Sequence, residues 1–192
     1  MDKAFQAAIQ AAVTVLRRGG VILYPTDTVW GLGCDATNSS AVRRLEQIKE
    51  RTPGHSMLVL LEHEVKLPYY VREVPDVAYD LIDAAVRPLT LIYPQARNLA
   101  PEIIAPDGTI GIRITHEAVS AALCAALKAP LVSTSANISG HPTPQSFAQT
   151  EEELKQRVDY IVPLRQEEPG GNTLPSEIIK IGAGGEVTLI RS

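Results

Sequence analysis

A dense group of cations follows one predicted helix of this 192-residue chain. Lys49 and Arg51 stand two residues apart in the segment Lys49-Glu50-Arg51-Thr52-Pro53-Gly54-His55. Arginine offers a two-pronged donor for phosphate or carboxylate, and lysine offers a mobile point charge. Because Pro53 disfavours helix at the residue before it, we expect an extended exit that turns both cations toward one site. The alternative is a solvated helix end, where the helix dipole favours cations without any ligand.

Short polar side chains gather at the ends of two predicted strands. The turn Pro25-Thr26-Asp27-Thr28 follows an apolar strand, and the loop 134–144 follows another and contains Ser135 and Asn137. In an open α/β sheet ligands bind at strand ends, and residues two apart in an extended loop face one side. The same residue types also favour hydrogen-bonded turns that bind nothing, so both interpretations stay open. Together with the cations, these segments predict a pocket that orders a small polar ligand beside a phosphate.

Arg113 interrupts a predicted strand in which apolar residues alternate with Gly111 and Arg113. A buried arginine needs an anionic partner, whereas an arginine on an edge strand could face water. No P-loop signature is present, and the two cysteines lack the spacing of a zinc site. The segment Gly31-Leu32-Gly33-Cys34-Asp35-Ala36 matches G-x-G-x-x-A, but it lies six residues past its strand without the expected acidic partner, so we interpret the match as coincidental.

The elements that must position these residues alternate between helix and strand in the first half of the chain, and strands cluster at its end. Asn38 or Ser39 should cap the second helix, and the segment Thr150-Glu151-Glu152-Glu153 has the pattern of a capping box. This order predicts one α/β domain over residues 1–192, with a twisted, mixed or antiparallel open sheet flanked by helices. Helices are predicted at 4–18, 40–49, 76–85 and 117–127, and a short helix is predicted from the capping box at Thr150 to about residue 157. Strands are predicted at 21–24, 57–61, 89–93, 109–114, 131–133, 160–162, 176–181 and 187–190.

Composition narrows the class of protein. Apolar residues make up 45% of the chain and charged residues 21%, as in a globular protein with a substantial core. The net charge of −4 gives no general attraction to nucleic acid or to an anionic membrane. Cys34 and Cys124 are expected to be reduced thiols, the N-terminus lacks the layout of a secretory signal, and the longest apolar run, 57–61, is too short to span a bilayer. These features predict a cytoplasmic protein.

Several motifs in one register resemble those of the YrdC/TsaC family of threonylcarbamoyl-AMP synthases. Residues 24–33 are similar to Y-P-T-x-T-x-Y-G-L-G, with Trp30 at the second aromatic position. Lys49-Glu50-Arg51 falls at the K-x-R of that family, and residues 135–140 match S-A-N-[IL]-S-G. Residues 88–92 resemble G-P-[FL]-T-L, and residues 111–113 resemble V-x-[VI]-R. The resemblance extends over roughly residues 5–190 and implies the short, single-domain form of the YrdC-like fold.

The resemblance implies synthesis of threonylcarbamoyl-AMP and pyrophosphate from L-threonine, bicarbonate or CO2, and ATP, with Mg²⁺ accompanying ATP and no metal held by the protein alone. It implies a transferase complex as partner, which passes the group to the adenosine beside the anticodon of tRNA, and leaves direct tRNA binding open. By position it assigns threonine contacts to Thr28, Arg113 and Ser133. It assigns catalytic charge neutralisation to Lys49 and Arg51, and ATP contacts to Lys49, Arg51, His55, Thr109, Ser135, Asn137 and Thr143.

Two other functions remain to be weighed. The first is a non-catalytic paralogue that binds RNA through the same concave surface, although Lys49, Arg51, Ser135 and Asn137 are all retained here. The second is a carbamoyl-transfer module of hydrogenase maturation proteins, which occurs inside much longer chains with zinc-finger-like segments. Both are less consistent with this sequence than the synthase.

Overall fold

The computed structural model of the protein describes residues 2–51, 57–168 and 175–192. The described strands form a mixed sheet in the order β7-β1-β2-β6-β3-β5-β4-β8-β9. The strands are β1 (Ile22–Tyr24), β2 (Gly31–Gly33), β3 (Leu58–Leu61), β4 (Leu89–Tyr93), β5 (Ile110–Ile114), β6 (Leu131–Ser135), β7 (Tyr160–Ile161), β8 (Glu177–Ile181) and β9 (Val187–Arg191). The helices are α1 (Lys3–Arg17), α2 (Ser39–Ile48), α3 (Leu67–Tyr70), α4 (Asp76–Ala84), α5 (Ala118–Leu127) and α6 (Glu152–Arg157).

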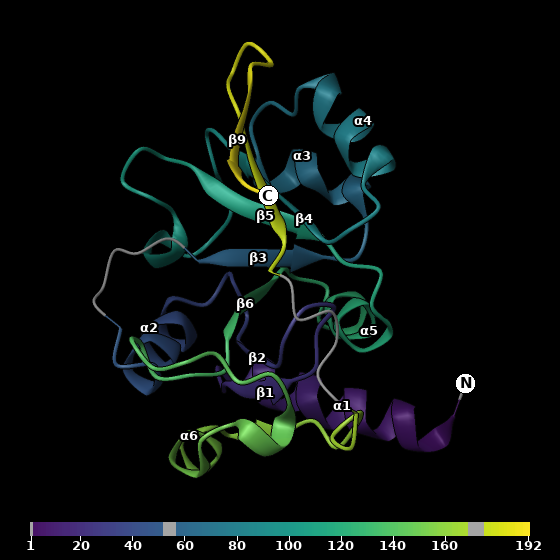
Figure 1. The fold of residues 1–192 in the computed structure, drawn as a ribbon, viewed down its shortest axis with the longest axis vertical. Helices are drawn as coiled ribbons and strands as arrows, with labels where there is room; N and C mark the ends of the chain where they lie inside the picture. The colour runs from purple at the N-terminus through teal and green to yellow at the C-terminus, as the bar shows by residue number, and fades with distance from the viewer. Residues whose placement is uncertain (1, 52–56, 169–174) are drawn as a thin grey trace.

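Parallel and antiparallel neighbours both occur in this sheet. Strands β7 and β1, β3 and β5, and β4 and β8 run parallel, and the other neighbouring pairs run antiparallel. The α/β class with a mixed sheet and flanking helices, predicted from the order of elements, is therefore confirmed. In Figure 1, α1 lies at one end of the molecule and the β8–β9 hairpin at the other, with β3 and β6 between them.

Helix ends follow from local sequence. The side chain of Asp2 accepts from the backbone N–H of Ala4 at the start of α1, and the side chain of Asn38 accepts from the N–H groups of Ser40 and Ala41 at the start of α2. The predicted Asn38 cap is confirmed. It fixes where α2 begins, and so where the cations at its other end emerge.

Two buried apolar clusters cover the opposite faces of the sheet. Because successive strand residues point to opposite faces, Leu60 joins one cluster while Val59 and Leu61 join the other. The cluster around Leu60 includes the inner faces of α1 and α5, and the second cluster includes that of α2. Both helix layers therefore hold the same central strands in place.

Four predictions about elements are wrong. Strand β2 was not predicted, and β6 extends two residues further than predicted, so Thr134 and Ser135 belong to a strand and not to a loop. The predicted capping box at Thr150 does not form: α6 begins at Glu152 after Glu151, whose side chain makes no capping bond. The buried hydroxyl of Thr150 has no hydrogen-bond partner among the described residues. The predicted cationic exit is also not extended, because Glu50 adopts a φ of 51°.

Candidate functional site

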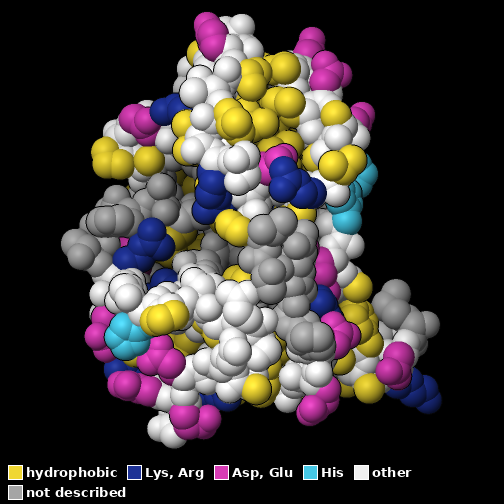
Figure 2. All heavy atoms as spheres, viewed as in Figure 1, with side chains coloured by type: hydrophobic (Ala, Val, Ile, Leu, Met, Phe, Trp, Pro, Cys, Tyr) yellow, Lys and Arg dark blue, Asp and Glu magenta, His cyan; other side chains and the backbone are white. Residues whose placement is uncertain are grey.

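A cavity of about 480 Å³ lies over the central strands of the sheet. Figure 2 shows the face viewed there hollowed at mid-height, with Lys and Arg side chains at the edge of the depression. Six of the residues predicted for the site line this cavity, and they come from five separate segments. These residues are Thr28, Arg51, Arg113, Ser133, Ser135 and Thr143.

The turn after β1 holds its hydroxyls in fixed positions. Thr26 Oγ1 donates to the carbonyl of Val29 at 2.6 Å and accepts from the backbone N–H of Thr28 at 3.1 Å. The two threonine hydroxyl oxygens are 3.2 Å apart, and both residues are buried. The sequence favours this geometry because a threonine hydroxyl bonds readily to the backbone two residues on. The hydroxyl of Thr28 is thereby presented to the cavity.

Arg113 supplies a buried positive charge to the cavity. Its strand, β5, lies between β3 and β4, with Leu60 and Thr90 opposite Arg113, so the alternative of an exposed edge-strand arginine is wrong. Its Nη2 is 2.9 Å from Asp27 Oδ1, which provides the predicted anionic partner. The contact lacks hydrogen-bond geometry, and Arg113 Nε is buried without a hydrogen-bond partner among the described residues. Arg113, which is 3% exposed, therefore lines the cavity with an anionic partner already in place.

Lys49 and Arg51 take different positions at the end of α2. Arg51 lines the cavity, whereas Lys49 is 3% exposed and donates from Nζ to the carbonyls of Ser135 at 2.6 Å and Asn137 at 2.8 Å. The solvated-end alternative is wrong for Lys49. Burial, and then the charge of Arg51, lower the pKa of Lys49 to about 8, while the carbonyl oxygens favour its charged form. Lys49 thus holds the loop after β6 and places its charge behind the cavity wall.

The segment after β6 is both a hydrogen-bonded turn and a wall of the cavity. Asn137 Nδ2 donates to the carbonyls of Ile138 at 3.1 Å and His141 at 2.7 Å, and its Oδ1 accepts from the hydroxyl of Ser135. Asn137 is buried and does not line the cavity, in contrast to Ser135. The two residues of the predicted pair therefore differ in position: Ser135 lines the cavity, and Asn137 fixes the turn.

One predicted ATP contact, Thr109, lies elsewhere, and another falls outside the described residues. Thr109 lines a separate cavity of about 180 Å³, and its hydroxyl donates to Asp107 at 2.6 Å. Met57 and Leu58 line both this cavity and the larger one, so the two are neighbours. His55 lies outside the described residues, and its contact remains a prediction.

The sequence did not predict a group of polar residues, mostly from the C-terminal part of the chain, that also line the cavity. Arg191 donates to the carbonyl of Ser176 at 2.8 and 3.1 Å, and the hydroxyls of Ser176 and Thr90 are 3.0 Å apart. Arg191, Ser176 and Gln145 all line the cavity. For Arg191 the only local signal was an arginine that ends an apolar run, which is also typical of a surface strand.

Charge and hydropathy add two observations on the described residues. None of the described residues that line the 480 Å³ cavity is acidic, and the described part of the chain holds no group of three or more His, Cys, Asp or Glu residues arranged to bind a metal ion. Over the same residues, no helix is both long enough and apolar enough to cross a membrane.

Known proteins share both the sequence and the fold of this chain. A threonylcarbamoyl-AMP synthase of Pseudoalteromonas translucida is 38% identical over 177 residues, which are 90% of this chain and 92% of that protein. The protein of the same name from Thiobacillus denitrificans is 36% identical over 88% of both chains. E. coli YciO superposes over 97% of this chain and 89% of its own, with a TM-score of 0.80 and 27% identity.

The match to P. abyssi Sua5 in complex with L-threonine has a TM-score of 0.82 at 26% identity. It covers 95% of this chain but 53% of the Sua5 chain, so this chain corresponds to about half of that protein. Residues 14–192 also match a family model described as Sua5_yciO_yrdC, Telomere recombination. Because that match spans most of the chain and the identities to full-length relatives exceed one third, the chain belongs to the Sua5/YciO/YrdC family.

Proposed function

We propose that this protein is an L-threonylcarbamoyladenylate synthase, which forms threonylcarbamoyl-AMP and pyrophosphate from L-threonine, bicarbonate or CO2, and ATP. Relatives that match over about nine tenths of both chains carry the name threonylcarbamoyl-AMP synthase. The observation that carries the proposal is that two arginines, Arg113 and Arg51, line one cavity in which no described lining residue is acidic. A substrate carboxylate and a phosphate chain can thus be held together.

In this proposal the carboxylate of the substrate threonine binds Arg113, and the other polar groups of that threonine lie near Thr28 and Ser133. The phosphates of ATP lie along Arg51 and Ser135, with Thr143 on the same side. The neighbouring small cavity with Thr109 suits the adenosine end of ATP, because Met57 and Leu58 join it to the larger cavity. Lys49 and Asn137 support the phosphate side from behind the wall.

The chemistry needs no covalent protein nucleophile. The neutral amine of threonine forms the bond to the carbon of CO2 and loses a proton, and a carbamate oxygen then displaces pyrophosphate from the α-phosphorus of ATP. Such a reaction gains most from positioning and from cations where charge develops, the role that we propose for Arg51 and, at longer range, Lys49. Mg²⁺ accompanies ATP as phosphate-bound counter-ion, since no described residue lining the cavity is acidic.

We further propose that the protein acts in the cytoplasm and that a tRNA threonylcarbamoyl transferase complex consumes its product. The alternative of a non-catalytic RNA-binding paralogue is not favoured, because the relatives carry an enzyme's name. The net charge of −4 also gives no general attraction to RNA.

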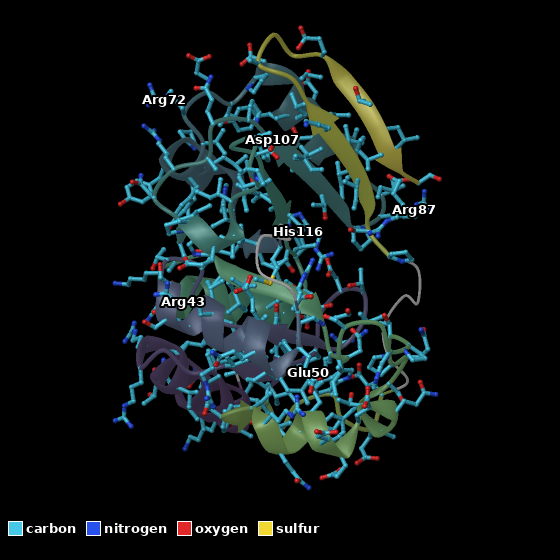
Figure 3. The ribbon with its side chains drawn as sticks, turned by 90° about the vertical axis from the view of Figure 1, so that its left-hand side faces the viewer. Arg43, Glu50, Arg72, Arg87, Asp107 and His116 are labelled. Carbon is cyan, nitrogen blue, oxygen red and sulfur yellow. The ribbon has the colours of Figure 1, made fainter. Side chains whose placement is uncertain are left out.

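The test is to incubate the protein with Mg²⁺, ATP, bicarbonate and one amino acid, and to detect the adenylate by mass spectrometry alongside pyrophosphate release. We expect a product that requires threonine, and a loss of roughly 100-fold or more in kcat/KM for Arg51→Ala. Arg43→Ala is the matched control, because Arg43 lies on the outer face of α2 with a 60% exposed side chain (Figure 3). No threonine-dependent adenylate from the unaltered protein would contradict the proposal.

A further inference from the structure

A second cavity lies directly behind the carboxylate-binding arginine. It has a volume of about 280 Å³ and shares no lining residue with the 480 Å³ cavity. Asp27 lines the second cavity and Arg113 lines the first. Since Asp27 Oδ1 and Arg113 Nη2 are 2.9 Å apart, this ion pair forms part of the wall between the two cavities.

Two segments form this wall, and in each of them successive residues line opposite cavities. In the turn after β1, Thr26 and Thr28 line the first cavity while Asp27 between them lines the second. On β5, Arg113 lines the first cavity while its neighbours Ile112 and Ile114 line the second. A ligand in the first cavity therefore meets the guanidinium and not the carboxylate, which approaches Arg113 from the opposite side.

We propose that Asp27 is a positioning residue: it holds the guanidinium of Arg113 from behind and so sets the affinity of the first cavity for the carboxylate of an amino-acid substrate. The inference rests on the proposed function only in naming threonine as that substrate. Asp27 lies 2.9 Å from Nη2 and lines the second cavity, whereas Arg113 lines the first, so an incoming carboxylate meets a guanidinium that is already oriented. A long, flexible arginine that is anchored on one side loses less conformational entropy when it binds an anion on the other.

The charges around Asp27 give this anchor a pH dependence. Burial raises the pKa of Asp27, and the guanidinium of Arg113 opposes this rise without cancelling it. Glu117 raises the same pKa further and His116 lowers it. The second cavity also contains Arg87, and Arg165 lies 2.9 Å from Glu117 as its ion-pair partner; Figure 3 shows Arg87 and His116 near the middle of the long axis. Asp27 therefore loses its charge at a less acidic pH than an ordinary aspartate.

The test compares Asp27→Asn with the unaltered protein and with Asp80→Asn, a control on the exposed side of α4. For Asp27→Asn we expect the KM for threonine to rise about 10-fold or more while the KM for ATP stays within about 2-fold. In the unaltered protein the KM for threonine should rise as the pH falls, and Asp27→Asn should lessen this dependence. Asp27→Glu, which keeps the charge, should restore part of the affinity.

A second readout does not require turnover. The increase in melting temperature on adding threonine reports its binding, and it should be smaller for Asp27→Asn than for Asp80→Asn. An Asp27→Asn protein that makes the adenylate with an unchanged or lower KM for threonine would overturn the inference and leave the proposed function intact. If the unaltered protein makes no adenylate, the proposed function fails, and the threonine-dependent melting shifts still decide the role of Asp27. If Asp27→Asn does not fold, the KM for threonine of Asp27→Glu decides it: a raised value supports the inference and an unchanged value overturns it.

Discussion

Lys49 shows how a single charge can be kept inside the fold. Its ammonium group donates to two backbone carbonyls and lies 3.4 Å from Asn137 Oδ1, so oxygen atoms surround it in place of water. Its own backbone carbonyl accepts from Ser139 N–H at 2.8 Å, which ties the same loop to α2 a second time. Buried charges persist only where such partners satisfy them. Lys49 is therefore a structural requirement of the candidate site as well as a charge near it.

The stability of the protein should depend on pH through Lys49. Its pKa is about 8 in the folded protein, against an ordinary value of 10.5. Between these values the unfolded chain binds a proton that the folded protein has lost, so the free energy of unfolding contributed by Lys49 rises with pH. Relative to Lys49→Met, the unaltered protein should gain on the order of 1–2 kcal/mol between pH 7.5 and pH 9.5 in urea unfolding. A pH-independent difference between the two proteins would show that Lys49 does not titrate in this range.

Residue types predicted which residues gather at the candidate site better than they predicted how each of them is oriented there. Arg113 and Ser135 were singled out by a charge in an apolar strand and hydroxyls at a strand end, but ligand-free alternatives stayed open until the family resemblance assigned their roles. The different orientations of Lys49 and Arg51 could not be read from the sequence, because they depend on the left-handed backbone at Glu50. Arg191 was missed for a similar reason, since its partner is the backbone of Ser176, which is distant in sequence.

At the scale of elements, β2 is the strand that the sequence did not reveal. Glycine is depleted in strands, and Gly31-Leu32-Gly33 offers one side chain for pattern recognition. The structure explains the glycines by close approach: β2 lies between β1 and β6, and the neighbouring chains leave little space. Longer elements with regular apolar spacing, such as α1 and β4, were predicted within one residue of their ends. An element such as β2, which depends on contacts with neighbouring strands, could therefore not be predicted from sequence spacing.

Replacing Gly33 with alanine should separate the strands around it. A Cβ atom there would lie 2.7 Å from Tyr24 Cε1 and 2.8 Å from the carbonyl oxygen of Val132, and the backbone oxygen cannot move without disturbing β6. At Gly31 the nearest atoms would be 3.2 Å away, at Thr26, and 3.3 Å away, at Thr134. We expect Gly33→Ala to lose about 1–3 kcal/mol more stability than Gly31→Ala in denaturant unfolding. Equal losses would show that crowding at Gly33 does not set the need for glycine.

At the scale of the whole molecule, the sheet joins two parts that hold different pieces of the site. The β1–β2–β6 part carries the Thr28 turn and the loop after β6. Strands β5 and β9 carry Arg113 and Arg191, and Ser176 immediately precedes β8. Strands β3 and β6 are neighbours in the sheet and join these parts at its centre. The cavity keeps its shape only as long as this central pairing is intact. The prediction that residues 1–192 form one domain therefore has a consequence for unfolding.

The single tryptophan allows this consequence to be measured. Trp30 is buried immediately before β2 and packs on Phe147 with ring centroids 4.8 Å apart, so its fluorescence reports on the β1–β2–β6 part. Far-UV circular dichroism reports on all helices and strands. If the sheet unfolds as one cooperative unit, the two signals should give the same midpoint and slope in urea, and both should shift together in Gly33→Ala. A fluorescence transition at lower urea than the dichroism transition would instead show that the part carrying Thr28 opens first. Threonine and ATP together should then bring the two transitions closer, because a ligand that spans both parts stabilises only the closed sheet.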